Sequence, residues 1–171
     1  DVNAITKIAV NTHLAGAAGT VTGAVLTRLI GGKTDIIMML NGALAGLVAI
    51  TAEPLTPSPI LAMVIGSIGA TIMYFGTKLL EKLQLDDVVG AIPVHMFAGI
   101  FGTLVAPLSN DKLSFGTQLT GVISVCIFSF VLSFVVFKIL KKTIGLRISK
   151  AAEKLGTDKA EIGVSAYSIR D

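Results

Sequence analysis

His95 is the residue of this chain best placed to do chemistry, because it lies inside an apolar segment, residues 88–108, that contains no Lys, Arg, Asp or Glu. An ionisable side chain is costly to move from water into hydrocarbon, so such residues usually face a bundle interior, a water-filled path or a cofactor. A neutral imidazole offers one hydrogen-bond donor and one acceptor. We therefore expect His95 to line a path rather than only to hydrogen-bond a neighbouring helix.

A second histidine, His13, lies in another apolar segment, residues 5–30. Two histidines on different helices could bind haem, but helices this rich in glycine pack too closely for a porphyrin, and we expect no cofactor. The only cysteine, Cys126, allows neither a disulfide within the chain nor a cysteine-based metal site, and we expect it to be buried. Because no nucleophile, base and orienting residue converge, we do not expect an enzyme.

The composition indicates whether this chain folds in water or in a membrane. Of the 171 residues 53% are hydrophobic and only 15% charged, with a mean hydropathy of +0.81, which is too apolar for a soluble globule. Crossing a bilayer takes about 20 apolar residues per helix. Five runs approach or exceed that length: residues 5–30, 35–52, 58–80, 88–108 and 115–139. We expect an all-α integral membrane protein with five transmembrane helices in residues 1–142 and a polar tail in residues 143–171.

Basic residues indicate the orientation of these helices. Lys and Arg cluster after the first, third and fifth runs, at positions Arg28, Lys33, Lys78, Lys82, Lys138, Lys141, Lys142, Arg147 and Lys150. The other two connections hold Glu53 and the pair Asp111 and Lys112. The positive-inside rule then places the tail in the cytoplasm and the N-terminus outside. The net charge of +3 reflects this topology, so no nucleic-acid partner is expected.

Small and helix-breaking residues indicate how the helices begin and meet. Glycines recur every three or four residues at Gly16, Gly19, Gly23, Gly42, Gly46, Gly66, Gly69, Gly99 and Gly102, which favours close helix contacts in lipid. Pro93 has no N–H for the carbonyl of Val89, so the fourth helix is expected to bend one turn before His95. Asp86 and Asp87 precede that helix and are expected to cap it.

Several motifs together resemble a known family. They are Asn11-Thr12-His13, the string Asn41-Gly-Ala-Leu-Ala-Gly-Leu-Val-Ala-Ile-Thr51, the segment from Asp86-Asp87 to His95, and Gly145-Leu146-Arg147 followed by Ala166-Tyr167. In order and spacing they are similar to the C-terminal half of ammonium transporters of the Amt/Mep/Rh family. The resemblance implies that the five helices correspond to the seventh through eleventh of an eleven-helix fold, and that the first six are missing from this sequence.

The resemblance also implies an assembly and a site. Family members are homotrimers in which each protomer encloses a narrow hydrophobic pore, built from two inverted five-helix repeats. His95 matches the second of two pore histidines, while its partner histidine lies in the missing part. The matching positions Ala91, Asn41, Thr51, Asp86 and Asp87 are expected to be pore-adjacent or structural. Two departures stand out, because Gly90 and Met96 occupy positions where many members have aspartate and glycine.

Two functions are compatible with these residues. The first is transport of ammonium or ammonia across the cytoplasmic membrane, in which the imidazole offers hydrogen bonds and the surrounding apolar side chains exclude hydrated Na⁺ and K⁺. The resemblance adds a PII-type regulatory protein as a cytoplasmic partner of the tail. The second is an ammonium-sensing membrane domain, since some relatives are fused to cytoplasmic signalling modules.

Overall fold

The computed structural model describes residues 1–166, and every regular element in that range is helical. The chain forms two compact units, residues 1–123 and residues 124 onward, which are taken separately below. Tyr167, which belongs to the last of the family-like motifs, lies outside the described residues.

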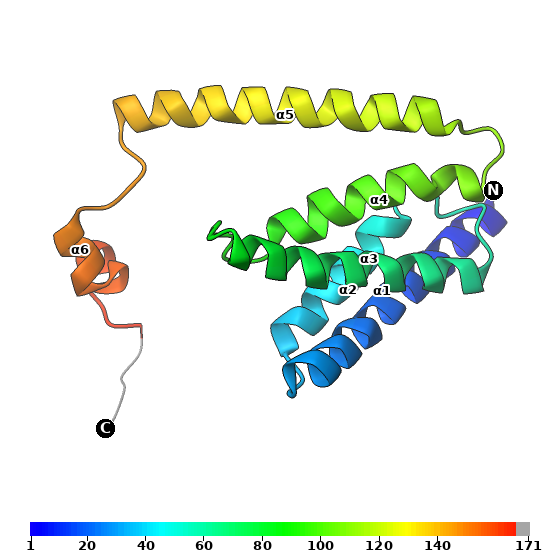
Figure 1. The fold of residues 1–171 in the computed structure, drawn as a ribbon, viewed down its shortest axis with the longest axis horizontal. Coiled ribbons are helices and arrows are strands. Elements are labelled where there is room, and N and C mark those ends of the chain that lie inside the picture. The colour runs from blue at the N-terminus through cyan, green and yellow to red at the C-terminus, as the bar shows by residue number, and fades with distance from the viewer. Residues whose placement is uncertain (167–171) are drawn as a thin grey trace. The chain divides into compact units, whose positions relative to one another are not determined.

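The first unit is a bundle of helices (Figure 1). Its long helices are α1 (Val2–Gly31), α2 (Ile36–Ile50) and α3 (Pro59–Lys82). The next helical stretch has three parts: a π-helical segment η1 (Ile92–Phe97), the helix α4 (Ala98–Val105) and a short 3₁₀ turn η2 (Ala106–Leu108). The first three helices thus lie where the sequence predicts them, whereas the fourth starts later and is not a uniform α-helix.

Local capping explains where α1, α2 and α3 begin and end. Gly32 ends α1 with φ 75°, a left-handed conformation that suits glycine. The Asp35 carboxylate then accepts a hydrogen bond from the Met38 N–H at 3.0 Å and starts α2. The Ser58 hydroxyl oxygen accepts one from the Leu61 N–H at 3.2 Å, and Pro59 occupies the first position of α3.

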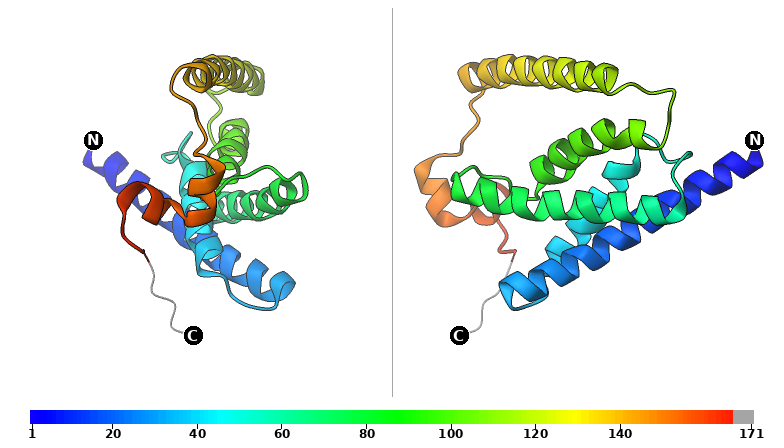
Figure 2. Two further views of the ribbon diagram at one scale, coloured as in Figure 1. Left: turned by 90° about the vertical axis from the view of Figure 1, so that its left-hand side faces the viewer. Right: turned by 45° about the vertical axis from the view of Figure 1, so that its right-hand side comes forward.

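Glycine-to-backbone contacts hold α1, α2 and α3 together. A side chain at Gly42 would lie 2.6 Å from the carbonyl oxygen of Gly19, so α1 and α2 approach through bare backbone. On α3, a side chain at Gly66 would collide with the backbone of Ala15 on α1. These helices lie side by side in each view (Figure 2). The glycine stripes therefore serve helix packing, as the sequence predicts.

The stretch η1–α4 packs against α2 and α3. A side chain at Gly102 would meet the backbone of Ala49 on α2, and one at Gly76 of α3 would meet the ring of Phe97. One buried cluster joins Val94 and Ala98 to residues of α2 and α3, namely Met38, Ala45, Met73 and Tyr74. The helical stretch that carries His95 is thus fixed by its inner face.

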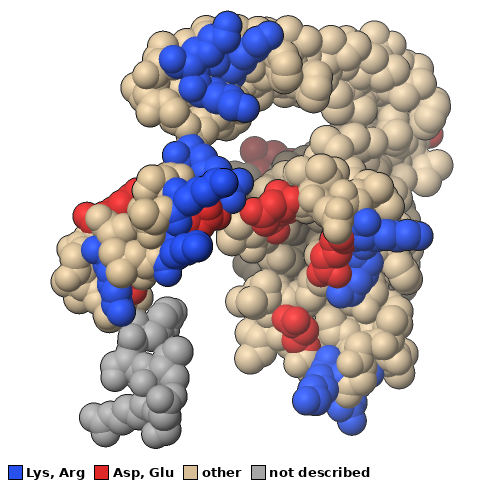
Figure 3. Space-filling view, turned by 60° about the vertical axis from the view of Figure 1, so that its left-hand side comes forward, with Lys and Arg blue, Asp and Glu red and all other residues tan. Residues whose placement is uncertain are grey.

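Among residues 1–166, three helices are long and apolar enough to cross a bilayer: α1, α3 and α5 (Phe115–Thr143). The other two apolar stretches are shorter, with α2 having 15 residues and the second running from Ile92 to Leu108. Charged side chains occupy only a few patches of the surface in the space-filling view (Figure 3). The all-α membrane fold is confirmed, while five full transmembrane helices remain a prediction.

Most of α5 belongs to the second unit, together with α6 (Lys150–Leu155) and the π-helical turn η3 (Asp158–Ile162). Arg147 forms a 2.6 Å ion pair with Glu153, and the Asp158 carboxylate accepts a hydrogen bond from the Ala166 N–H at 2.8 Å. The backbone N–H groups of Ala166 and Lys159 lower the pKa of Asp158. On α5, Cys126 is half-buried, so the expectation of a buried thiol is wrong.

The close approach of α1 and α3 predicts the effect of one added methyl group. Gly66→Ala forces a Cβ atom into the backbone of Ala15 and should destabilise the full-length protein by about 1–3 kcal/mol, measured by thermal unfolding in detergent. Gly121→Ala on α5 is the matched control, because apart from its chain neighbours and the adjacent backbone of its own helix no atom lies within 4 Å of its added Cβ. Equal melting temperatures for the two variants would contradict this packing.

Candidate functional site

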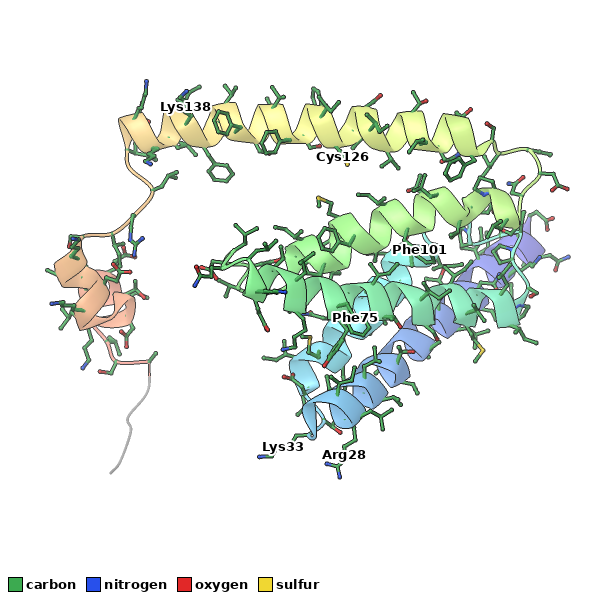
Figure 4. All side chains as sticks on the ribbon, in the orientation of Figure 1. Arg28, Lys33, Phe75, Phe101, Cys126 and Lys138 are labelled. Carbon is green, nitrogen blue, oxygen red and sulfur yellow. The ribbon has the colours of Figure 1, made fainter. Side chains whose placement is uncertain are left out.

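The candidate site lies where the chain enters the π-helical segment η1. The sides of this segment differ: Pro93 and Val94 are buried, whereas Ile92, His95 and Met96 are exposed. Beyond this segment, Phe101 on α4 (Figure 4) packs against a second buried cluster of the unit, which consists of Ala15, Ala49, Ile50, Ala62 and Ile65. His95 therefore sits on a rigid helical stretch with its side chain directed away from the packed face.

The π-helical geometry was not predicted from the sequence. In η1 the Ala98 N–H lies within hydrogen-bonding range of the carbonyls of Pro93 and His95 instead of making a regular α-helical bond. Single π-helical turns within α-helices are rare and often occur at functional sites. The only sequence signal for it is Pro93, which indicates an irregular backbone without specifying its type.

Asp87 caps this helical stretch. Its two carboxylate oxygens accept hydrogen bonds from the N–H groups of Ala91 at 2.9 Å and Ile92 at 2.8 Å. The first regular helical bond runs from the Val94 N–H to the carbonyl oxygen of Gly90 at 3.1 Å. Pro93 therefore lies in the first turn, where a missing N–H costs little, and the expectation that it bends a helix already begun at Val88 is wrong.

Asn41 of α2 reaches the turn just before this helical start. Its side-chain amide donates a hydrogen bond to the carbonyl oxygen of Val89 at 3.0 Å. The next residue, Gly90, has φ 76°, a left-handed conformation that favours glycine. A side chain at Gly90 would lie 2.7 Å from the Asn41 amide nitrogen. Asn41 and Gly90 are thus in tight contact.

Some of the other expected site residues lie at the entry to η1, residues 87–92, and others lie elsewhere in the first unit. Ala91 is exposed and contributes its N–H to the Asp87 cap, whereas Asp86 is exposed and makes no side-chain hydrogen bond to any described residue. Thr51 ends α2, ten residues from Asn41, and its hydroxyl donates to the Leu47 carbonyl at 2.6 Å. The structure therefore brings Asn41, Asp87 and Ala91 to the entry and places Thr51 about 15 Å along α2 from Asn41.

The other histidine and the possible metal ligands lie elsewhere. His13 is exposed on α1, and its Nδ1 donates a hydrogen bond to the Ala9 carbonyl at 2.7 Å. Within residues 1–166 no three His, Cys, Asp or Glu side chains form a group that could hold a metal ion.

A polar network that the sequence did not reveal joins the loops at the far end of α2. The Asn110 amide donates to the Glu53 carboxylate at 2.6 Å, and the Thr56 hydroxyl donates to that of Ser109 at 3.2 Å. Burial acts to raise the pKa of Glu53, but hydrogen bonds from Asn110, Thr56 and Leu55 outweigh it and lower that pKa. Residues more than 50 positions apart form these bonds, so no local pattern signals them.

Asn11 anchors the proline-rich loop from inside the bundle. It is fully buried, and its amide donates to the carbonyls of Pro54 and Pro57, both at 2.9 Å. The same residue opens the Asn11-Thr12-His13 motif of the sequence, for which the structure thus supplies a structural role.

Basic residues gather at the opposite end of the first unit. Arg28 and Lys33 lie around the turn from α1 to α2 (Figure 4). Lys33 and Lys78 line the same open cavity of about 580 Å³, and Lys78 pairs with Glu81 at 3.0 Å. Two of the predicted cytoplasmic connections thus meet at one end of the unit. The acidic loop residue Glu53 lies at the other end of α2.

Comparison with known proteins gives one consistent result. Residues 1–167 match the sequence pattern described as Ammonium Transporter Family. Ammonium transporter Amt2 of Archaeoglobus fulgidus is 43% identical, over 95% of this chain and 39% of its own length. Ammonium transporter Amt1 of Methanocaldococcus jannaschii is 33% identical, over 96% of this chain and 43% of its own. The chain therefore spans about two fifths of the relatives it matches.

Solved structures agree with the sequence comparison. A structure titled Sensor Amt Protein superimposes with a TM-score of 0.83 at 32% identity, covering 94% of this chain and 42% of that one. Mep2 of Candida albicans superimposes with a TM-score of 0.77 at 26% identity, covering 92% of this chain and 39% of that one. The fold described above is thus that of ammonium transporters.

The Asp87 cap predicts a difference between two adjacent carboxylates. Asp87→Ala leaves the N–H groups of Ala91 and Ile92 without their partner, and should cost about 1–2 kcal/mol of stability with faster amide exchange in residues 91–92. Asp86→Ala is the matched control and should change neither. The cap has no such role if exchange is equally fast in both variants of the full-length protein.

Proposed function

Because this chain belongs to the Ammonium Transporter Family, we propose that it forms part of a multi-pass membrane protein that moves ammonium or ammonia across the cytoplasmic membrane. One observation carries the proposal beyond the family match. His95 is exposed on a helical stretch whose other side is fixed in the bundle, so its ring is free to face a path.

The imidazole suits this substrate chemically. Ammonium is too strongly hydrated to enter an apolar path as an ion, whereas ammonia needs only hydrogen-bond partners along the way. A neutral imidazole supplies one donor and one acceptor, and with a second histidine from the remaining part of the protein it would pass a proton or hold a file of ammonia molecules. The exposed neighbours Ile92 and Met96 provide apolar walls. Such walls disfavour hydrated Na⁺ and K⁺, which gain no compensating ligands.

The finer organisation follows from the same proposal. The chain supplies the seventh through eleventh of eleven helices, so α2 and the stretch from η1 to η2 span the membrane along with α1, α3 and α5. Residues 1–142 form the membrane part and residues 143–171 a cytoplasmic tail. Three protomers assemble into a homotrimer, and the tail contributes to docking of a PII-type regulatory protein. The meeting of Lys33 and Lys78 at one end of the bundle supports this orientation.

Ammonium sensing is the second candidate, and a specific observation favours it. The structure titled Sensor Amt Protein superimposes with the higher TM-score of the two described above. A sensor would use the same histidine face to bind ammonium without sustained passage. An ammonium concentration jump on the full-length protein in proteoliposomes separates the two, because a transporter gives an electrical current and a pure sensor gives none.

Substitution of His95 tests the pore role. His95→Ala removes both hydrogen-bonding positions, so the ammonium-driven current should fall by about tenfold or more, or discrimination against K⁺ should be lost. His95→Glu should retain part of the current with weaker discrimination, since a carboxyl group still relays protons but also attracts a bare cation. Wild-type current and selectivity in both variants, with normal membrane insertion, would make His95 a structural residue only.

Cysteine accessibility tests the orientation. In a full-length protein with Cys126→Ser, a cysteine at Lys82 should be shielded from an impermeant thiol reagent added outside intact cells, whereas one at Asp111 should react. Permeabilised cells provide the control, because both positions should then be labelled. Labelling of Lys82→Cys alone in intact cells would reverse the proposed orientation.

A further inference from the structure

We propose that Asn41 is a positioning residue for His95: it ties the turn before η1 to α2 and so sets where the helical stretch that carries His95 begins. The inference rests on the proposed function, because it assigns Asn41 a part in the same path. Asn41 itself does not need to touch the substrate, since it acts through the backbone of Val89.

The contact between Asn41 and Val89 bridges two elements that are distant in sequence. The amide nitrogen lies 3.0 Å from the Val89 carbonyl oxygen, across 48 positions of the chain. This carbonyl belongs to the turn that precedes the helical stretch, so it has no helical partner. The Asn41 amide gives this carbonyl a hydrogen-bond partner and thereby ties the turn to α2.

Gly90 makes the contact possible. Its φ of 76° aims the chain from the turn into the helical stretch, and its lack of a side chain leaves room for the Asn41 amide. A methyl group at this position would lie 2.7 Å from the amide nitrogen, closer than such contacts allow. The resemblance places an aspartate here in many family members. In this chain a carboxylate at position 90 would compete with Asn41 for the same space.

The position of this turn decides the position of His95. The Gly90 carbonyl accepts the first helical hydrogen bond from Val94, which is 2% exposed and immediately precedes His95. Each residue of an α-helix turns by about 100°, so moving the helical start by a single residue would direct the His95 side chain to another face. Two side chains hold this helical start: Asn41 donates to a carbonyl of the preceding turn, and Asp87 accepts from the first N–H groups of the helix.

Two substitutions separate hydrogen bonding from simple packing. Asn41→Leu keeps the approximate volume but removes the donor at every pH. Asn41→Asp keeps the shape and becomes a donor only when its carboxyl is protonated, and the neighbouring Val89 carbonyl oxygen favours that protonated form. At about pH 8 the carboxylate should repel the Val89 oxygen, and at about pH 5.5 the acid should restore the hydrogen bond.

In full-length protein, ammonium current relative to wild type at the same pH should fall about tenfold in Asn41→Leu at both pH values. Asn41→Asp should show a similar fall at the higher pH and recover at least about threefold at the lower. The titratable groups of these elements are Asp87 and His95 on the entry and η1, and Lys33, Asp35, Tyr74 and Lys78 around the cavity at the start of α2. They are present in every variant, so the wild-type comparison removes their contribution.

Amide exchange over residues 88–97 provides a readout that does not depend on transport. Exchange should be faster than wild type in Asn41→Leu at both pH values, and in Asn41→Asp only at the higher pH, after correction for intrinsic rates. Asn110→Asp is the matched control: it also loses an amide that donates to an oxygen, but at the far loops, and should leave residues 88–97 unchanged.

The outcomes distinguish the two proposals. Absence of current in wild type contradicts transport, and the exchange result alone then decides the role of Asn41. If the wild-type protein carries current but Asn41→Asp shows no pH-dependent recovery, the positioning role is overturned and transport stands. Unchanged amide exchange in both Asn41 variants leads to the same conclusion.

Discussion

Every helix start leaves backbone N–H groups without partners inside the helix, and the entry to η1 is built around this constraint. Apolar surroundings raise the free-energy cost of leaving such groups unpaired. At the helical start before His95, the Asp87 carboxylate accepts hydrogen bonds from two of these N–H groups, and Pro93 has no N–H that needs a partner. The Val89 carbonyl of the turn is met by Asn41 of another helix. The N–H groups of Ala91 and Ile92 and the Val89 carbonyl are therefore all paired at the start of the stretch that carries the exposed His95 side chain.

Close backbone packing provides the second half of that scaffold. Without a strong hydrophobic drive between helices in lipid, contacts depend on how near the backbones approach. Gly19 and Gly42 bring α1 against α2, Gly66 brings α3 against Ala15, and Gly102 brings α4 against Ala49. Backbone contacts at these glycines thus fix the positions of α1, α2, α3 and α4 relative to one another. This precision matters for His95, because a small rotation of α4 relative to α2 would also move the turn that Asn41 holds.

The sequence predicted the elements well and the site only in part. Apolar run length located α1, α2 and α3, because it is a local signal. The later start of the fourth helix was missed, since Val88 and Val89 are as apolar as the helix that follows and only φ 76° at Gly90 interrupts it. The hydrogen bonds of Asn41, Asn11 and Asn110 join residues more than 40 positions apart. The polar character of these side chains is readable from the sequence, but their partners are not.

Gly90 illustrates how a departure from a family pattern acquires meaning only in three dimensions. In the structure the amide of Asn41 lies in the space beside Gly90 and donates to the Val89 carbonyl. Support for the entry thus comes both from Asp87 of the entry itself and from Asn41 of the neighbouring helix α2. The Asn41 amide is neutral, so it pairs with the Val89 carbonyl without adding a second carboxylate beside that of Asp87.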